Sequence, residues 1–456
     1  MEDTIIFIHS ENAYASGKRR RPRGPRPASS ECRPRKTSSQ ADLPLPKDNL
    51  VDKAIAHYIK TNLSPTFRVP SLLQTVEEDV LLIYRARQTD PIIELALSVL
   101  SLVLYGRIHS HPEAIVQACL SYEQLLKQTV LALSSTPTPC YQHTETTLFV
   151  TFCMSRYEDA VHEPNKKSQK KSFTSASHHD GSLALLRTIR DRQSGETMKQ
   201  LPNIVKSTRR CMIKSALLRS KDLPEWIHDG QIFGETEQFD VTYDRFAIRL
   251  VHLRHQLSLL RSGTSTQESA AALVEESYNL EKEFGEWSAR YSASWSRPTP
   301  HEQNEVEILR DNSDQDEIKV QAAVCLKLHA TDILIISTYL SLLHPTVSSS
   351  SDVTSPSSTR ATARMHTIAM DFLSALNNLA GNKIHTTNVK SLIDEESGVL
   401  RWVVWPLSMI LLAEEMDEND KLFLRDLMKE VGKISGFAVL EDVEQKGIEK
   451  MGVVAV

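Results

Sequence analysis

The stretch Asp90–Leu133, DPIIELALSVLSLVLYGRIHSHPEAIVQACLSYEQLLKQTVLAL, predicts two helices joined by a short link. Asp90 is a good N-cap residue, and the fixed φ of Pro91 suits the first turn of a helix. The run Ile92–Leu104 is apolar on nearly every face, which is typical of a helix that is buried all round. It is shorter than the roughly 20 apolar residues that cross a membrane.

The rest of this stretch predicts a second helix packed on a neighbour. Gly106 is expected to end the first helix in the left-handed conformation. The capping-box pattern of Ser110–Glu113 then starts the second helix. Apolar residues that recur every three or four positions predict one stripe facing a partner helix: Ile115, Cys119, Tyr122, Leu126, Val130 and Leu133. Because short links join antiparallel neighbours, we expect an all-α fold, a large irregular domain of antiparallel helix pairs.

The composition is that of an ordinary helical protein. The chain has 456 residues, of which 40% are hydrophobic and 24% charged, and its net charge is only -5. These values permit a substantial core and give no overall acidic or basic character. The six cysteines show no C-x-x-C spacing, and most lie in apolar helical stripes, which indicates a reducing compartment: Cys32, Cys119, Cys140, Cys153, Cys211 and Cys325. The start of the chain is no signal peptide and no window reaches transmembrane length, so we expect a soluble intracellular protein.

Two parts of the chain differ in composition. Residues 1–48 are rich in Arg, Pro, Ser and Lys, and predict a disordered basic arm. Residues 49–456 predict one helical domain with flexible insertions near 161–177, 294–317 and 346–360. Beyond the first hairpin, helices are expected near 48–62, 79–86, 145–157, 181–189, 205–218, 318–343, 361–379, 400–412 and 418–431. Regular stripes at Tyr243–Leu260 and Leu273–Trp287 predict two more helices, which pair within the bundle or with another molecule.

The basic arm contains the compact run KRRRPRGPR. Its cations are candidates for nuclear localisation or for phosphate contact: Lys18, Arg19, Arg20, Arg21, Arg23 and Arg26. The alternative is a merely solvated tail. Because the run is compact and interleaved with proline, we expect nuclear import.

Signatures of catalysis are missing from the sequence. It contains no glycine-rich phosphate loop, no H-E-x-x-H and no nucleophile elbow. The densest ligand-like cluster, His178–Asp180, offers too few ligands for a metal without a matching partner pattern, and a polar helix start explains it better. The acidic group Glu414, Glu415 and Asp417 lacks the paired-aspartate spacing of all-helical isoprenoid cyclases. We therefore expect no catalytic, cofactor or metal site, and no enzyme.

Several short motifs follow one another along the chain. They are Tyr105-Gly106, His111-Pro112-Glu113-Ala114, Tyr157-Glu158, His178 with Gly181 and Leu185-Leu186, Leu223-Pro224-x-Trp226, and Trp405-Pro406-Leu407. In this order they resemble the regulatory domain of fungal zinc-cluster transcription factors, from about residue 50 to the end. Each motif alone is weak, and their order carries the resemblance.

The resemblance implies a nuclear regulator of genes transcribed by RNA polymerase II. It implies protein partners, either a second copy of the chain or related transcription factors, and no membrane. The family's six-cysteine module, which holds two zinc ions, is missing from this sequence, although residues 11–27 resemble the basic linker that follows it. Either an upstream exon is missing from the gene model, or the protein is a paralogue without a DNA reader.

It follows that we expect DNA contact to be weak, or to depend on the missing module. No cofactor is expected in this chain, and zinc is expected only with an upstream cysteine cluster. Two other functions remain open from the sequence. One is a helical protein-interaction scaffold that does not bind DNA, and the other is an all-helical enzyme such as an isoprenoid cyclase.

Overall fold

The computed structural model describes residues 47–62, 70–74, 76–87, 89–135, 141–162, 175–193, 203–235, 238–263, 267–295, 310–343, 356–379 and 400–442. The chain divides into two units, residues 1–45 and 46–456, and every described residue belongs to the second. The basic run Lys18–Arg26 therefore lies outside the described residues, as do Cys32, Cys140 and most of the three insertions.

The described residues are almost entirely helical and contain no β-strand, which confirms the predicted all-α class. Short 3-10 turns lie at η1 (Ser71–Leu73), η2 (Glu225–Ile227), η3 (Gly230–Phe233) and η7 (Ala438–Glu441). The α-helices are α1 (Lys47–Asn62), α2 (Val76–Ala86), α3 (Pro91–Ile108), α4 (Pro112–Ser135), α5 (Tyr141–Ala160), α6 (Ser175–Gln193), α7 (Asn203–Arg219), α8 (Gln238–Arg261), α9 (Gln267–Trp295), α10 (Arg310–Leu343), α11 (Pro356–Leu379), α12 (Leu400–Leu411) and α13 (Glu418–Ser435).

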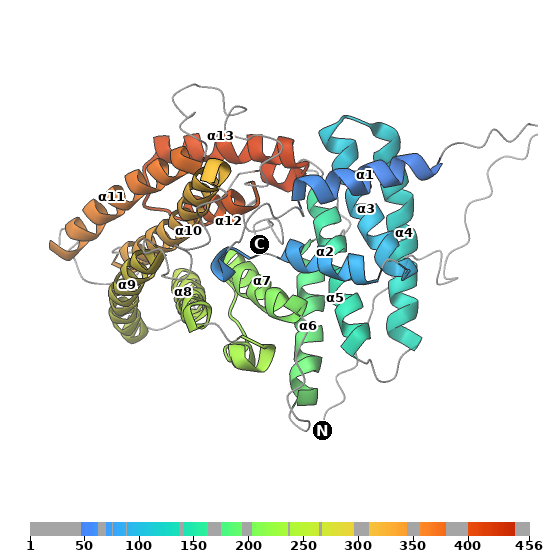
Figure 1. The fold of residues 1–456 in the computed structure, drawn as a ribbon. Helices are drawn as coiled ribbons and strands as arrows, with labels where there is room; N and C mark the ends of the chain where they lie inside the picture. The colour runs from blue at the N-terminus through green and yellow to red at the C-terminus, as the bar shows by residue number, and fades with distance from the viewer. Residues whose placement is uncertain are drawn as a thin grey trace, which may run out of the picture. The chain divides into compact units, whose positions relative to one another are not determined.

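Two central helices organise the packing of unit 46–456 (Figure 1). In the first half of the sequence, α1, α4 and α5 pack on α3, and α5 also packs on α6. In the second half, α8, α9, α11 and α12 pack on α10. Helix α7 contacts α2, α5 and α6 as well as α8, so it joins the two groups. Buried side chains from α1 to η7 form one continuous hydrophobic core.

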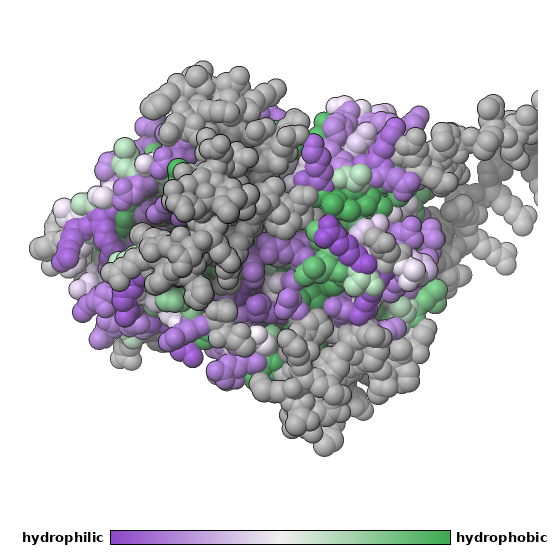
Figure 2. Space-filling view, in the orientation of Figure 1, coloured by the Kyte–Doolittle hydropathy of each residue, from purple (hydrophilic) through white to green (hydrophobic). Residues whose placement is uncertain are grey.

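The surface of this unit is uneven in polarity. Figure 2 shows hydrophobic side chains exposed between α1 and α2, whereas the surface over α9 and α11 is mostly hydrophilic. Leu82 on α2 is 58% exposed. Single exposed apolar residues are normal on folded proteins, but groups of them mark interaction sites.

Helix α3 is buried over most of its length, as its apolar sequence predicted, and residues 96–104 are buried without interruption. The Asp90 side chain accepts a hydrogen bond from the backbone N–H of Ile92 at 3.2 Å, and Pro91 opens the first turn. Eight apolar side chains of the helix are at most 1% exposed: Ile93, Ala96, Leu97, Val99, Leu100, Leu102, Val103 and Leu104. At roughly 25 cal/mol per Å² of apolar surface, such burial makes α3 a major source of stability.

The predicted role of Gly106 as the left-handed end of α3 is wrong. Gly106 lies inside the helix, and Ser110 is the residue with positive φ, at 51°. The backbone N–H of His111 bonds to the Gly106 carbonyl at 2.7 Å and that of Ser110 to the Arg107 carbonyl at 3.4 Å, which is the Schellman pattern. Gly106 serves close packing instead, because a Cβ there would lie 2.6 Å from Ile115 Cγ1.

The predicted capping box at the start of α4 is also wrong. Ser110 ends α3, so its side chain does not cap the next helix in the way the sequence suggested. His111 takes that position, and its Nδ1 accepts a hydrogen bond from the backbone N–H of Ala114 at 3.3 Å. Pro112 opens the helix and Glu113 is exposed in its first turn. The turn between α3 and α4 is thus only His109–His111, in which Ser110 belongs to the end of α3 and His111 to the start of α4.

The predicted contact stripe of α4 is largely on the outside of the fold. Of its six members, Ile115, Cys119, Val130 and Leu133 are exposed, and only Tyr122 is buried. The side of α4 that meets α3 carries small residues instead, with Ala114 and Ala118 fully buried. Small side chains let two helix backbones approach closely, and this decides which side faces inward.

The two regular stripes in the second half pair within the molecule. On α8, the stripe from Tyr243 to Leu257 is buried. Phe246 packs edge to face on Phe284 of α9, with ring centroids 5.4 Å apart. The ring centroid of Trp287 on α9 lies 5.6 Å from that of Phe246. The intramolecular alternative is therefore the observed one.

Helices at the edges of the insertions are longer than predicted. Helix α6 begins at Ser175, α10 at Arg310 and α11 at Pro356, where the sequence suggested flexible residues up to 177, 317 and 360. By length and composition alone, Pro91–Ile108 and Glu317–Leu343 could cross a membrane, although we expected no such window. Other residues of the chain bury 61% and 83% of these two windows, as in core helices.

Candidate functional site

Tyr105, which the sequence motifs include, belongs to a group of rings at the turn between α3 and α4. Its ring centroid lies 5.7 Å from that of His57 on α1, 4.5 Å from that of His109 and 6.1 Å from that of His111. These rings tie α1 to the hairpin. These contacts connect α1 to both sides of the turn.

Two other motifs meet at Tyr122 of α4. The Tyr122 hydroxyl donates to Glu158 of α5 at 2.7 Å and lies 3.2 Å from Nε2 of His178 on α6. The Tyr122 ring stacks on Tyr157 with centroids 4.0 Å apart. Burial raises the pKa of both Tyr122 and Glu158. The motifs Tyr157-Glu158 and His178 are therefore joined in space through a residue outside both.

The ligand-like cluster His178–Asp180 is split among different neighbours. His179 Nδ1 lies 2.6 Å from the Ser215 hydroxyl of α7, and the Asp180 carboxylate pairs with Arg219 at 3.3 Å. Burial lowers the pKa of His178 to about 4 and that of His179 to about 3. Both imidazoles are therefore neutral at pH 7. Gly181 lies exposed inside α6, and a Cβ added there would have no atom within 4 Å, so no neighbour requires a glycine.

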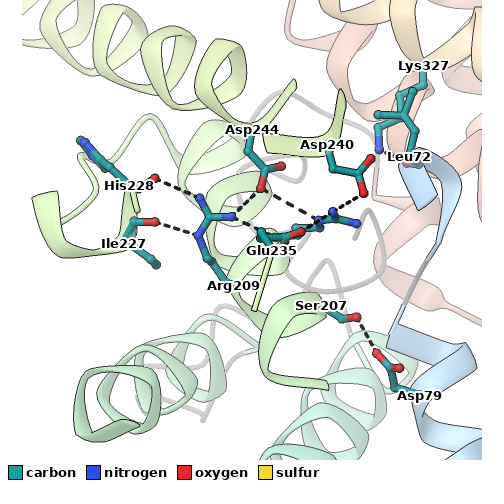
Figure 3. A network of polar contacts seen from close by, with 11 residues as sticks. Leu72, Asp79, Ser207, Arg209, Ile227, His228, Glu235, Asp240, Asp244 and Lys327 are labelled. Atoms are coloured by element: carbon teal, nitrogen blue, oxygen red, sulfur yellow. Dashed lines mark hydrogen bonds and ion pairs between the residues drawn. The ribbon is translucent and has the colours of Figure 1, made fainter. Parts of the chain in front are cut away.

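The strongest concentration of buried charge lies between α7, η3 and α8 (Figure 3). Arg209 of α7 is 1% exposed and is the largest of the fully buried side chains. Its Nη1 donates to Asp244 of α8 at 2.5 Å, and its Nε donates to the backbone carbonyl of Ile227 at 2.8 Å. A third hydrogen bond, at 3.3 Å, reaches the carbonyl of His228. A buried guanidinium needs such partners because its transfer from water is costly.

The neighbouring Arg210 completes this charge network, which we define as Arg209, Arg210, Glu235, Asp240 and Asp244. Arg210 binds Glu235 through two hydrogen bonds, at 2.9 Å and 2.7 Å, and donates to Asp240 at 2.6 Å. This fork-to-fork geometry is the strong form of an ion pair. Burial raises the pKa of Glu235 to about 7, against the opposing influence of Arg210.

The charge network also holds the Leu223-Pro224-x-Trp226 motif. Arg209 bonds the carbonyls of Ile227 and His228, which directly follow Trp226. The Trp226 ring itself stands 6.1 Å from that of Phe233 and 5.6 Å from the guanidinium carbon of Arg190 on α6. Trp226 therefore joins the segment between α7 and α8 to α6.

A small cavity borders the charge network on the side of α10 and α12. Its volume is about 20 Å³, and Arg210, Asp240, Lys214, Lys327 and Trp405 contribute to its lining. That is room for roughly one water molecule. Such a space does not accommodate a small-molecule effector, whose pockets typically measure roughly 300 Å³ or more.

Two lysines, the buried Lys327 and the half-buried Lys214, flank this cavity. Lys327 of α10 donates to the backbone carbonyl of Leu72 at 2.5 Å, and its Nζ stands 4.7 Å from the ring of Tyr243. Lys214 of α7 has its Nζ 5.4 Å from the ring of Trp405, the residue of the late Trp-Pro motif. Burial lowers the pKa of both lysines. Pro406 lies inside α12.

The cysteines in the described ranges do not fit the zinc cluster that the family resemblance implies. Cys119, Cys153, Cys211 and Cys325 are carried by different helices, and Cys153 and Cys211 are buried. Burial raises the pKa of the Cys211 thiol to about 12, which opposes the thiolate form that binds zinc. No group of three His, Cys, Asp or Glu side chains suited to a metal occurs in this part of the chain.

Sequence reasoning missed the charge network. A partial signal was present, because Arg209 and Arg210 are adjacent in one helix, and Asp240 and Asp244 share one side of the next one, four residues apart. Their burial depends on Glu235 and on carbonyls in the connecting segment, which no periodicity reveals. The network is structural in its geometry, since each charge is directed at another part of the fold.

No protein-family model, curated protein or solved structure matches this chain. The resemblance to fungal zinc-cluster regulators thus stays a prediction that rests on the motifs quoted above.

Proposed function

We propose that this chain regulates transcription by RNA polymerase II in the nucleus, through its helical domain and partner proteins. The observation that carries the proposal is the order of the family-like motifs along the sequence, from Tyr105 to Trp405. Residues of these motifs contact helices that are distant in the sequence. Glu158 and His178 meet at Tyr122, while Trp226 and Trp405 flank the charge network.

In this proposal the charge network has a structural role and no chemistry is assigned to it. The polar groups of the charge network are directed at one another, and the cavity beside them has room for about one water. The proposal assigns the activity to surfaces that recruit other proteins. The basic run at 18–26 supplies import into the nucleus and weak, salt-dependent contact with phosphates.

The direct test tethers the whole chain to a reporter gene through a foreign DNA-binding module. A change in reporter expression of several fold relative to the module alone is expected if the chain recruits or blocks the transcription machinery. An unchanged reporter, with the fusion present in the nucleus, overturns the proposal. It would favour a protein-interaction scaffold, an alternative supported by the exposed apolar residues of α4.

Nuclear import is tested separately in a fluorescent fusion of the whole chain. Replacing Arg19, Arg20, Arg21 and Arg23 by alanine is expected to abolish nuclear enrichment, because import receptors bind compact basic runs. The matched control replaces the other basic run, Lys166, Lys167, Lys170 and Lys171, and should leave the enrichment intact. Equal enrichment in the wild type and the arginine variant contradicts the role of residues 18–26.

A further inference from the structure

A second cavity, of about 240 Å³, lies between α9, α10 and α11. It shares no lining residue with the small cavity beside the charge network. Helix α10 packs on both α9 and α11, so the cavity is bounded by three helices of the second half of the sequence (Figure 1). Its volume is that of roughly eight water molecules. A small organic molecule therefore fits in it.

The cavity exists because small residues of α9 line it. Gly285, Ser288, Ala289 and Ser292 follow one another in steps of three, one and three, so they share one side of the helix. A Cβ at Gly285 would lie 2.9 Å from Nη2 of Arg364 on α11. A larger residue would therefore displace the guanidinium, and the small side chains leave open the space that Arg364 borders.

A buried carboxylate oxygen at this cavity has no partner. Asp332 of α10 lines the cavity and is 7% exposed. Its Oδ2 accepts a hydrogen bond from Nη2 of Arg364 at 2.9 Å. Its Oδ1 is buried and has no hydrogen-bond partner in the part of the chain that the structure describes. Because a buried acceptor left unsatisfied is costly, a ligand that donates to Oδ1 gains by pairing with it.

The charges around the cavity favour a cation. Arg364 also donates to Glu281 of α9, so one guanidinium is shared by two carboxylates. Burial raises the pKa of Asp332 to about 6, against the lowering influence of Arg364, so the arginine compensates this carboxylate only in part. Asp371 of α11 adds a negative charge that acts on His329 at the cavity wall. The negative groups therefore outnumber the positive one.

The rest of the lining offers acceptors and apolar surface. Burial lowers the pKa of His329, so its imidazole is neutral at pH 7 and has one nitrogen that accepts. The Ser288 hydroxyl donates to the Gly285 carbonyl at 3.1 Å, and its oxygen can still accept. Leu328 and Ile368 supply apolar wall. An ammonium group, which only donates, and a short apolar body match this set.

We propose that this cavity binds a small primary amine in its ammonium form, with the charged nitrogen at Asp332 and the apolar body against Leu328 and Ile368. The ammonium donates to Oδ1 and so completes the hydrogen bonds of the carboxylate. The body covers apolar surface of α10 and α11 that otherwise faces water. The inference depends on α9, α10 and α11 and stands independently of the proposed transcriptional role.

The test measures binding to the full-length chain by isothermal titration calorimetry at about pH 7.5, where Asp332 is ionised. The probes are benzylamine, benzyl alcohol and benzoate, which share one body and differ in the charge of the polar group. Benzylamine should bind with a Kd of about 1 mM or tighter, as suits a ligand of its size. The other two should bind at least about tenfold more weakly, because only the ammonium makes a charge-assisted hydrogen bond to Asp332.

Three results of this titration overturn the proposal. Absence of benzylamine binding up to about 10 mM shows that the cavity holds water only. Equal binding of all three probes shows that the apolar walls alone retain them. Tighter binding of benzoate shows that Arg364, rather than Asp332, selects the ligand.

Two variants locate the site. Asp332→Asn keeps the size of the side chain but removes its charge, and should raise the Kd for benzylamine at least about tenfold. Ala289→Trp fills the cavity from an exposed position of α9, and should abolish binding while Asp332 and Arg364 are kept. Circular dichroism checks that each variant is folded. If Asp332→Asn is not, the substitution at position 289 and its control decide alone.

The matched control adds the same bulk to the same helix. Ala293→Trp lies at an exposed position of α9 outside the cavity lining, and should change the Kd by less than about twofold. Wild-type affinity in Ala289→Trp overturns the proposal, because benzylamine then binds elsewhere. Equal losses of affinity in the two tryptophan variants overturn it as well, because the effect does not then come from filling the cavity.

Discussion

The α3–α4 hairpin and the α7–α8 region join their helices by opposite chemistry. In the hairpin, apolar side chains of α3 and small residues of α4 meet across the short turn His109–His111, and Gly106 permits close approach. Between α7 and α8, a longer segment is held by Arg209, whose hydrogen bonds reach Asp244 and two backbone carbonyls. One region is stabilised by burial of apolar surface, and the other by paired charges removed from water.

The two kinds of contact differ in how the protein responds when a substitution removes one of the two contacting side chains. Apolar contacts are non-directional, so their neighbours can partly relax after a substitution. A buried ion pair leaves an uncompensated charge when one member is removed, even if the intact pair adds little net stability. The two regions should therefore respond differently to single substitutions.

The largest effect is expected in the charge network. Arg209→Met removes the partner of Asp244 and of the carbonyls of Ile227 and His228. The free energy of unfolding should fall by about 3–5 kcal/mol, because these groups stay buried without their donor. Urea denaturation monitored by circular dichroism measures the change. The control Arg245→Met, at an exposed position of the same region, should change it by less than about 0.5 kcal/mol. Equal losses in both variants would refute the structural role of the network.

A smaller loss is expected in the hairpin. A Cβ at Gly106 would lie 2.6 Å from Ile115 Cγ1 and 3.1 Å from the His111 carbonyl oxygen, so α4 must shift outward in Gly106→Ala. We expect a loss of about 1–3 kcal/mol in the same assay, as for other overpacked sites. Gly181→Ala is the matched control, because nothing lies within 4 Å of that position. It should stabilise the protein by up to about 1 kcal/mol through helix propensity. If both variants gain stability, the close approach of α3 and α4 is unimportant.

The smallest of the three effects is a pH dependence of the free energy of unfolding, which comes from the buried His179. His179 is neutral in the folded protein because burial lowers its pKa to about 3, whereas in the unfolded chain it takes up a proton below about pH 6.5. Its contribution to stability is therefore complete above pH 6.5 and is lost as the pH falls. At pH 5.5 the loss from this one group is about 1.4 kcal/mol.

The measurement compares wild type with His179→Asn, which can still bond the Ser215 hydroxyl but does not titrate. Burial raises the pKa of Glu235 to about 7 and that of Asp79 to about 6. The contribution of these two carboxyls to the free energy of unfolding therefore falls as the pH rises. They act in the opposite direction and are common to both proteins. The wild type should lose about 1.4 kcal/mol more than the variant between pH 7.5 and 5.5. Parallel pH curves would show that His179 is already protonated or exposed.

Much of the fold could be read from the sequence because apolar periodicity reports secondary structure directly. Asp90 and Pro91 start α3 as predicted, and residues 96–104 of the apolar run that follows are buried on all sides. The stripes of α8 and α9 also lie where their spacing puts them. In the candidate site, the sequence identified His178, Trp226 and Trp405 as positions of interest, and each makes a specific contact with a distant helix.

Tertiary structure alone decided the remaining points. Helix α4 has two apolar sides, and only the fit of Ala114 and Ala118 against α3 determines which one is buried. Whether an arginine is solvated or buried depends on partners from other segments, so the adjacent Arg209 and Arg210 did not by themselves predict that Arg209 is buried while Arg245 is exposed. Local pattern specifies helices through the period of their own side chains. The choice of facing sides and the pairing of buried charges depend on residues that become neighbours only when the chain folds.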